Sequence, residues 1–194
     1  VAVGEVGLDY HWPEPARDIQ QAVFIDMVKL AVELDVPIII HDREAHGDTL
    51  DILRQYGKGL RGVFHCYSGS LEMTDELLRM GFYFGFDGPL TYPNSKRAKR
   101  VAAHLPLERM LIETDCPYLT PQAHRGQRNE PAYVHYVAEE IAALRGIDVA
   151  EVARVTTENA KRLFAIPQSA VLVGIEASLN VSNGSPTWRP LQYS

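Results

Sequence analysis

The sequence predicts an α/β fold built on a parallel sheet, and two observations support this. Short apolar runs alternate along the chain with stretches of helical periodicity, which is typical of β/α units around a parallel sheet. The apolar runs also finish with side chains that can bind a metal ion or move a proton. Ligands gather at the carboxyl ends of parallel strands, so such endings favour this fold class.

The strand candidates all begin apolar and finish polar. They are VAVGEVGLDY at residues 1–10, VPIIIHDR at 36–43, LRGVFHCYS at 60–68, GFYFGFDG at 81–88 and RMLIETD at 109–115. Near-continuous apolar runs of this kind are expected for strands that are buried on both faces of a sheet.

The segments between these runs predict helices. Residues 16–35 place Val23, Met27, Leu30, Ala31 and Leu34 at helical spacing, which predicts a buried stripe. Further helices are expected over 48–57, 70–81, 93–106 and 131–146, followed by a paired helical end over 147–166. Glycine closes several of these segments, as helix ends with a left-handed residue require.

Composition limits the classes of protein that remain. The chain has 194 residues, 46% of them hydrophobic, which is enough for one sizeable core. A net charge of -6 argues against nonspecific nucleic-acid binding, but not against a nuclease whose carboxylates hold cations. With two cysteines, no signal peptide and no apolar run of membrane-spanning length, we expect a cytoplasmic protein without a membrane partner.

The last part of the chain differs from the rest. Residues 1–166 carry the β/α pattern, whereas residues 167–194 scatter Ser, Asn, Gly and Pro without a consistent period. We therefore expect one domain over 1–166 and an atypical C-terminal tail over 167–194, either disordered or foreign to the domain.

Polar side chains stand where the strand candidates end. They are Glu5 and Asp9, His41 and Asp42, His65, Asp87, and Glu113 and Asp115. A single histidine at a strand end is more often an ordinary core residue. Several independent strands ending in the same way instead predict one shared site at the carboxyl edge of the sheet.

Alternation along a strand predicts which of these side chains face the site. Residues two apart should face the same way, which pairs Glu5 with Asp9, His41 with Arg43, His65 with Tyr67, and Asp115 with Glu113. Cys66 should then point outward, as a small buried hydrophobic residue.

The ligand types indicate metal-assisted hydrolysis. Two imidazoles and two carboxylates, with no thiolate facing inward, suit an open site for zinc, manganese or magnesium. A carboxylate such as Glu5 can bridge two ions, whose field forms hydroxide from water and stabilises charge on a phosphoryl oxygen.

These stretches resemble the TatD family of metal-dependent deoxyribonucleases, a branch of the amidohydrolase-like barrels. The matching segments are GEVGLDY at 4–10, PIIIHDREA at 37–45, GVFHCYSG at 62–69, ETDCPYL at 113–119, HRGQRNEP at 124–131 and ENAKRLF at 158–164. Each is weak alone, but the set, in this order and spacing, is highly specific and reaches from Val1 to about Ile166.

The resemblance implies a TIM-type β/α barrel that binds divalent ions, two in a complete site, and hydrolyses phosphodiester bonds in DNA, expected as a 3′-to-5′ exonuclease. It implies that Glu5, His41, His65 and Asp115 are metal ligands, with Glu5 and Asp115 also catalytic. Contacts to the DNA substrate are expected from Arg43, Tyr67, Arg125 and Asn129.

The sequence departs from the family in one place. Family members begin with a strand ending His-x-His, which supplies further ligands, followed by two more β/α units before the glutamate strand; none of these is present here. We therefore expect a partial barrel of about five strands, impaired activity, and self-association through the exposed sheet edge.

Two other functions stay open from the residues alone. One is a related barrel hydrolase acting on another ester or amide, because the same ions activate water for acyl transfer. The other is a catalytically inert truncated remnant, which should bind no stoichiometric divalent ion. The basic run from Lys96 to Arg100 could meet phosphate, although a solvated helix face explains it more simply.

Overall fold

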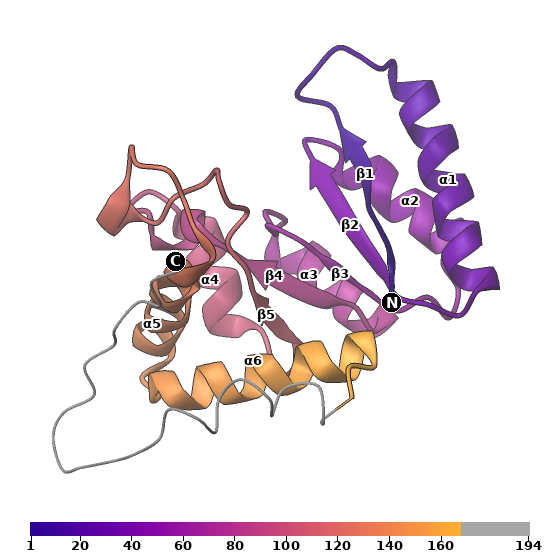
Figure 1. Ribbon diagram of the computed structural model, residues 1–194. Helices are drawn as coiled ribbons and strands as arrows, with labels where there is room; N and C mark the ends of the chain where they lie inside the picture. The colour runs from indigo at the N-terminus through magenta and orange to yellow at the C-terminus, as the bar shows by residue number, and fades with distance from the viewer. Residues whose placement is uncertain (168–194) are drawn as a thin grey trace, which may run out of the picture.

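The computed structural model describes residues 1–167 as five parallel strands connected by helices (Figure 1). The strands lie side by side in chain order, so each crossover moves one position along the sheet. Their bounds are β1 Val3–Asp9, β2 Ile38–Arg43, β3 Gly62–Phe64, β4 Tyr83–Phe86 and β5 Met110–Ile112. The prediction of an α/β fold with five parallel strands is confirmed, whereas the predicted tail lies outside the described residues from 168 onward.

The last three strands are shorter than the sequence predicts. β3, β4 and β5 end before His65, Asp87 and Glu113, so these polar residues lie in the loops that follow the strands. The backbone turns sharply there, with φ of 44° at Cys66 and 55° at Asp115. Strand alternation therefore stops before it reaches the polar residues.

The helices lie where the sequence places them, with ends shifted by a few residues. Their bounds are α1 Arg17–Glu33, α2 His46–Tyr56, α3 Leu71–Met80, α4 Lys96–His104, α5 Val134–Arg145 and α6 Val149–Phe164. Short 3-10 turns cover Gly88–Thr91 (η1), Leu107–Arg109 (η2), Gln122–His124 (η3) and Pro131–Tyr133 (η4). The ends of α3 follow the expected capping chemistry, because Ser70 accepts a hydrogen bond from the N–H of Met73 and Gly81 adopts φ of 93°.

The predicted buried stripe of α1 is wrong except at Ala31, which is buried. The buried residues of this helix are Gln20, Phe24, Val28 and Ala31, whereas Val23 is 50% exposed and Leu34 is 57% exposed. A second apolar stripe competes with the predicted one on this helix. Docking against β1 selects the stripe that includes Gln20, whose amide makes hydrogen bonds to the end of that strand.

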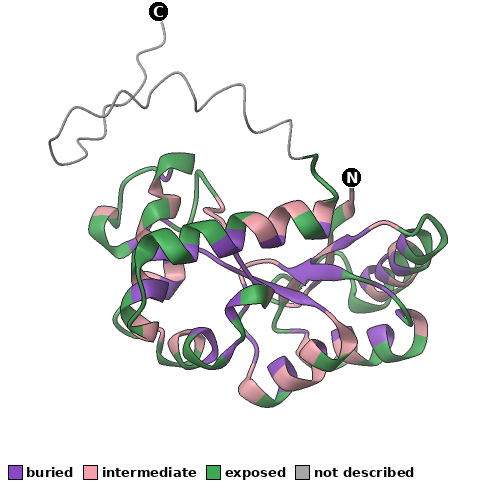
Figure 2. Cartoon of the chain, turned by 90° about the horizontal axis from the view of Figure 1, so that it is seen from below, coloured by how far each residue is buried: buried purple, intermediate pink, exposed green. Residues whose placement is uncertain are grey.

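The two faces of the sheet bury different clusters. Alternate strand residues such as Ile38, Ile40, Phe64 and Phe84 join the large core, to which helices α1 to α5 and the first half of α6 contribute. The opposite, concave face carries Ile39, Val63, Tyr83 and Leu111, which pack against Leu163, Ala160 and Phe164 of α6. Figure 2 shows buried residues along the strands and on the sheet-facing sides of the helices.

Helix α6 is attached to the sheet by a buried amide. Asn159, which is 1% exposed, donates hydrogen bonds of 2.8 Å to the carbonyl oxygens of Leu107 and Met110. This contact fixes the ENAKRLF segment beneath β5 (Figure 1). The predicted domain boundary at residue 166 stays a prediction, since α6 ends at Phe164 and the description of the chain stops soon after it.

Candidate metal centre

Glu5 within β1, His41 within β2 and His65 directly after β3 lie close together, and these three residues are called the metal triad below. Oε1 of Glu5 lies 3.1 Å from Nδ1 of His41 and 2.9 Å from Nε2 of His65, and these two ring nitrogens are 2.9 Å apart. Of the residues that the structure describes, these form the one group whose ligand atoms converge closely enough to hold a metal ion.

The metal triad fits a divalent cation. Neighbouring ligands around an octahedral ion are about 3.0 Å apart when the metal–ligand bonds are about 2.1 Å long, which matches the separations of 2.9 to 3.1 Å between the donor atoms. Two imidazoles and one carboxylate suit zinc or manganese better than magnesium, which prefers oxygen ligands. Three protein ligands also leave positions open for water or substrate.

Asp9 orients the ring of His41. Its Oδ2 lies 3.1 Å from Nε2 of His41, the nitrogen on the far side of the ring from the triad. Gln20 of α1 holds Asp9 in turn, because it accepts a hydrogen bond from the N–H of Asp9 and donates one to its carbonyl oxygen. A carboxylate on the outer ring nitrogen fixes the tautomer and raises the basicity of a ligating histidine.

Glu113 supports the metal triad from the β5 side. Its Oε1 accepts a hydrogen bond of 2.6 Å from the N–H of Cys66, and its Oε2 lies 3.9 Å from Nδ1 of His65. Burial raises the pKa of Glu113, while the hydrogen bond from Cys66 opposes the shift. Gly85 makes room for this carboxylate, because a Cβ at that position would collide with Oε1.

Asp115 lies outside the metal triad. It is half-buried on the loop after β5, and its ligand atoms are not among those that converge with Glu5, His41 and His65. Its charge does reach this end of the sheet, since it contributes to the raised pKa of both Glu113 and Asp87. Its predicted roles as a metal ligand and catalytic residue stay predictions.

Two of the four expected substrate contacts are accessible. Arg43 is exposed at the end of β2, in register with Asp9. Arg125 is exposed on the loop after η3, with its guanidinium 4.2 Å from the centre of the Tyr92 ring. Both could meet phosphate without disturbing the fold.

The other two expected contacts are buried. Asn129 is 2% exposed, and its amide donates hydrogen bonds to the carbonyl oxygens of Thr114 and Tyr118. Asn129 attaches its loop to the loop that carries Asp115, and its expected contact with substrate stays a prediction. Tyr67 is 6% exposed, and its hydroxyl accepts a hydrogen bond from Thr74, which leaves only its ring accessible.

Cys66 follows β3, and its predicted outward orientation stays a prediction. It lies beyond the end of β3, where its backbone supports Glu113 and its side chain lines a pocket together with Asp87. Burial raises the pKa of the Cys66 thiol, and the neighbouring carboxylate of Asp87 raises it further. That Cys66 is not a metal ligand stays a prediction.

Several supporting residues were not assigned a role from the sequence. Asp9 and Glu113 do stand among the polar strand ends, and alternation pairs them with Glu5 and Asp115, so a signal for them exists. Gln20 and Gly85 act only through contacts with distant segments. No local pattern identifies them.

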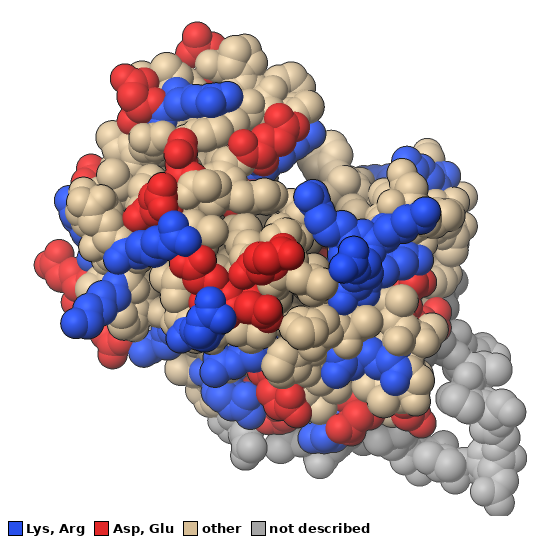
Figure 3. All heavy atoms as spheres, turned by 180° about the vertical axis from the view of Figure 1, so that it is seen from behind, with Lys and Arg blue, Asp and Glu red and all other residues tan. Residues whose placement is uncertain are grey.

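The surroundings of the centre combine both signs of charge. A cavity of about 380 Å³ lies between the sheet and α6, with His65 and Glu113 in its lining. Figure 3 shows one face of the molecule, on which acidic side chains near the middle are flanked by groups of Lys and Arg.

No helix among residues 1–167 combines the length and apolar character needed to cross a membrane.

Comparison with known proteins gives consistent matches. The family model for TatD-related DNases matches residues 1–165. The chain is 52% identical over 167 residues to YabD of Bacillus subtilis strain 168 and 45% identical over 170 residues to YcfH of Escherichia coli K12, both described as uncharacterized metal-dependent hydrolases. These alignments cover 86% and 87% of the chain, which spans about two thirds of the relatives, 66% of YabD and 64% of YcfH.

Solved structures show the same similarity. The crystal structure of YjjV, a TatD homologue from Escherichia coli K12, superposes with a TM-score of 0.80 and 33% sequence identity, covering 86% of this chain and 64% of YjjV. A TatD family hydrolase from Entamoeba histolytica superposes with a TM-score of 0.74 over 84% of this chain and 63% of that protein, and at 23% identity it supports the fold alone.

Proposed function

The chain belongs to the TatD-related DNase family, and from that premise we propose that it is a metal-dependent hydrolase that cleaves phosphodiester bonds in DNA, working from the 3′ end of a strand in the cytoplasm. The observation that carries the proposal is the convergence of Glu5, His41 and His65 from three strands, with donor atoms 2.9 to 3.1 Å apart. Metal-assisted hydrolysis requires such an open site.

Different residues at this site are proposed to bind the metal ion, to orient its ligands and to accept a proton. Glu5, His41 and His65 would hold a divalent ion, which supplies Lewis acidity and a nucleophilic hydroxide when it is bound. Asp9 holds the ring of His41 in orientation, and Glu113 stays close to His65 on the other side. Asp115 is proposed to accept a proton from the attacking water, because it carries a half-buried carboxylate on the loop that follows β5.

The charge distribution supports a polyanionic substrate. Arg43 and Arg125 are exposed at this end of the sheet, and α4 adds the exposed side chains of Lys96, Arg97 and Arg100. Lys99 is instead paired with Glu140 at 2.7 Å. Phosphate contacts of this kind supply most of the affinity for nucleic acid, which makes binding sensitive to salt.

A nuclease assay on the purified chain tests the proposal. A single-stranded oligonucleotide labelled at its 5′ end is incubated with manganese, and the products are separated by length. We expect a ladder that shortens from the 3′ end, no reaction after chelation, and no reaction with Glu5→Gln. The rate relative to that of a relative such as YcfH tests the expectation that activity is impaired.

Metal analysis separates the alternatives. An inert remnant would bind no stoichiometric divalent ion, whereas the proposed enzyme should bind zinc or manganese through the metal triad. If metal binds but DNA stays intact while simple carboxylic esters or amides are hydrolysed, the DNase proposal is wrong and the related hydrolase takes its place.

We also propose that the chain associates with itself through its sheet edges. In the described residues, β1 and β5 each pair with one neighbouring strand only. The exposed apolar side chains of Ile19, Val23 and Leu34 on α1 add to the surface available for contact. Size-exclusion chromatography with light scattering tests this: a monomer at all concentrations would refute it.

A further inference from the structure

A second pocket adjoins the metal centre on its β3–β4 side. It has a volume of about 270 Å³ and is lined by residues that follow β3 and β4, by η1 and by the start of α4. Cys66 connects the two sites, because its N–H supports Glu113 while its side chain lines the pocket. The volume is below the range of about 300–1,000 Å³ typical of drug-sized ligands, so a single small ring is the natural occupant.

The pocket contains a buried acceptor. Asp87 is 3% exposed, and its Oδ2 is buried without a hydrogen-bond partner among the described residues. A buried polar atom of this kind is costly unless a partner is supplied. Because a carboxylate only accepts hydrogen bonds, the partner it selects carries an N–H or O–H group.

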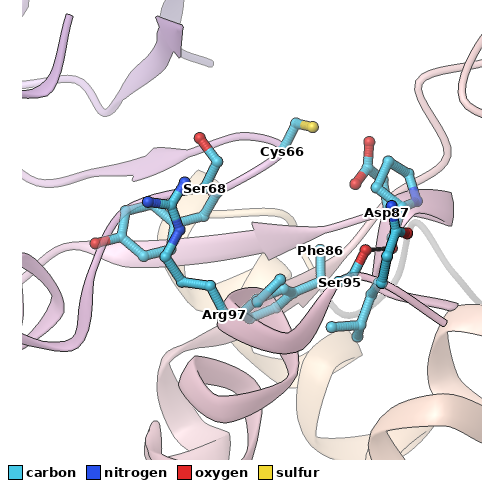
Figure 4. Close-up of a pocket in the computed structure, with 11 residues that line it drawn as sticks. Cys66, Ser68, Phe86, Asp87, Ser95 and Arg97 are labelled. Atoms are coloured by element: carbon cyan, nitrogen blue, oxygen red, sulfur yellow. Dashed lines mark hydrogen bonds between the residues drawn. The ribbon is translucent and has the colours of Figure 1, made fainter. Parts of the chain in front are cut away.

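The rest of the lining supplies apolar walls and a cation. The ring of Tyr67 and the side chains of Phe86 and Leu90 are apolar surfaces. Arg97 is exposed at the rim and makes no ion pair with any residue from 1 to 167. In Figure 4, Arg97 and Ser68 lie on one side of the pocket and Asp87 lies on the other.

We propose that this pocket holds one base of the DNA strand, with Asp87 accepting a hydrogen bond from an amino group of the base and Arg97 contacting the adjacent phosphate. The assignment rests on the proposed function, which supplies the nucleic-acid substrate. Apolar walls, a buried acceptor on one side and an exposed cation on the other together match a nucleotide. The site lies next to the metal triad, where the strand would pass.

The chemistry of the acceptor gives the site a preference. Cytosine, adenine and guanine each carry an exocyclic amino group that can donate to a carboxylate. Thymine has no amino group, and its ring N–H lies between two carbonyl oxygens that a carboxylate would repel. The site should therefore disfavour thymine by about tenfold in affinity, a typical effect of one hydrogen bond to a charged group.

Binding of single nucleotides tests this without relying on catalysis. The affinities of the chain for the 5′-monophosphates of deoxycytidine and thymidine are measured by calorimetry with a chelator present, above the pH at which Asp87 ionises. We expect the cytidine nucleotide to bind about tenfold more tightly. Asp87→Asn should abolish this preference, because an amide can also donate to a thymine carbonyl.

Matched variants separate the parts of the pocket. Arg97→Gln should weaken both nucleotides equally and keep the preference, and Ser68→Trp should block both while leaving the Asp87 carboxylate in place. Asp51→Asn, on the exposed side of α2, is the control and should change nothing. Equal affinities in the unmodified chain, no binding of either nucleotide, or an unchanged preference in Asp87→Asn would each overturn the proposal.

The outcome is distinguishable from failure of the proposed function. Because the chelator removes any metal, nucleotide binding reports on the pocket alone. A chain that degrades DNA with manganese but shows no preference between the two nucleotides would refute the base site and leave the nuclease proposal intact. If the chain binds the two nucleotides with the expected preference but cleaves no DNA, the base site is supported and the nuclease proposal is refuted.

Discussion

The metal triad and two further acids, the buried Asp87 and the half-buried Glu113, belong to the same sheet but lie in different environments. The side chain of Glu5 is 50% exposed and contacts two imidazoles. Asp87 is 3% exposed, and burial raises its pKa to about 7. Two carboxylates of the same parallel sheet therefore differ in their exposure to solvent and in their partners.

The difference shows what determines the chemistry of a strand end. At β1 to β3 the polar side chains converge on one another, so ionised carboxylate and imidazole donors suit a cation. At β4 and β5 the acids face a pocket and a backbone N–H, where an added negative charge is unfavourable. The burial of a carboxylate and the groups that it contacts therefore determine whether it is suited to bind a metal ion or to accept a hydrogen bond.

Asp87→Asn tests the buried side of this comparison and should have the largest effect. Burial raises the pKa of Asp87 from 3.8 to about 7, so the folded protein retains a proton that the unfolded chain releases. Stability conferred by the protonated form is present at low pH and is lost as pH rises through this window. Such a shift corresponds to at most about 4 kcal/mol.

Unfolding in urea from about pH 4 to about pH 8 measures this effect. Asparagine cannot ionise, so the variant should show a smaller loss of stability over that range than the unmodified chain. The remaining slope should come from Glu113, whose pKa is also raised by burial. Parallel declines in both proteins would contradict the assignment.

Glu5→Gln tests the metal-binding side. It keeps the shape of the side chain but removes the only carboxylate of the metal triad. Loss of a residue that merely supports a metal ligand lowers the affinity by up to about a hundredfold, so loss of a ligand should lower the affinity for zinc or manganese by at least this factor. Titration calorimetry measures the change. The matched control is Glu44→Gln, because Glu44 also contacts a histidine, His11 at 2.9 Å, but outside the triad; equal losses in both would refute the site.

Gly85→Ala tests the boundary between the two regions. The new Cβ would displace the Glu113 carboxylate from the N–H of Cys66, and we expect the free energy of unfolding to fall by about 2 kcal/mol. Gly47→Ala is the control, since a Cβ there meets no neighbour and alanine in a helix should be neutral or stabilising by up to about 1 kcal/mol. A similar response of both variants in thermal melts would show that Gly85 is not needed for this contact.

Asp9→Asn should give the smallest effect, because it acts through His41. Weakening the carboxylate contact to Nε2 of His41 should lower metal affinity by about tenfold. A loss as large as that of Glu5→Gln would instead indicate that Asp9 binds the metal directly.

The strand order and the metal triad were accessible from the sequence because they depend on local signals. Apolar runs mark the strands, and the carboxyl ends of parallel strands must share one edge, which brings Glu5, His41 and His65 together. The family resemblance added the identity of the ligands. Asp115 shows the limit of this reasoning. It lies after the end of β5 and has a positive φ, so strand alternation no longer predicts which way its side chain points.

The errors arose where distant contacts decide the outcome. On α1 the apolar pattern permits two faces, and the buried one includes Gln20, a polar residue that becomes favourable inside only because Asp9 and Pro15 accept its hydrogen bonds. The two carbonyl partners of the Asn129 amide, Thr114 and Tyr118, are likewise not marked by any local pattern in the sequence.

The placement of α6 has a consequence for synthesis on the ribosome. This helix is the last of the described elements, yet it covers Val63, Tyr83 and Leu111, which emerge much earlier. Until the segment around Asn159 has left the exit tunnel, these apolar side chains stay exposed to solvent and can aggregate. The growing chain should therefore need chaperones most in the last part of translation.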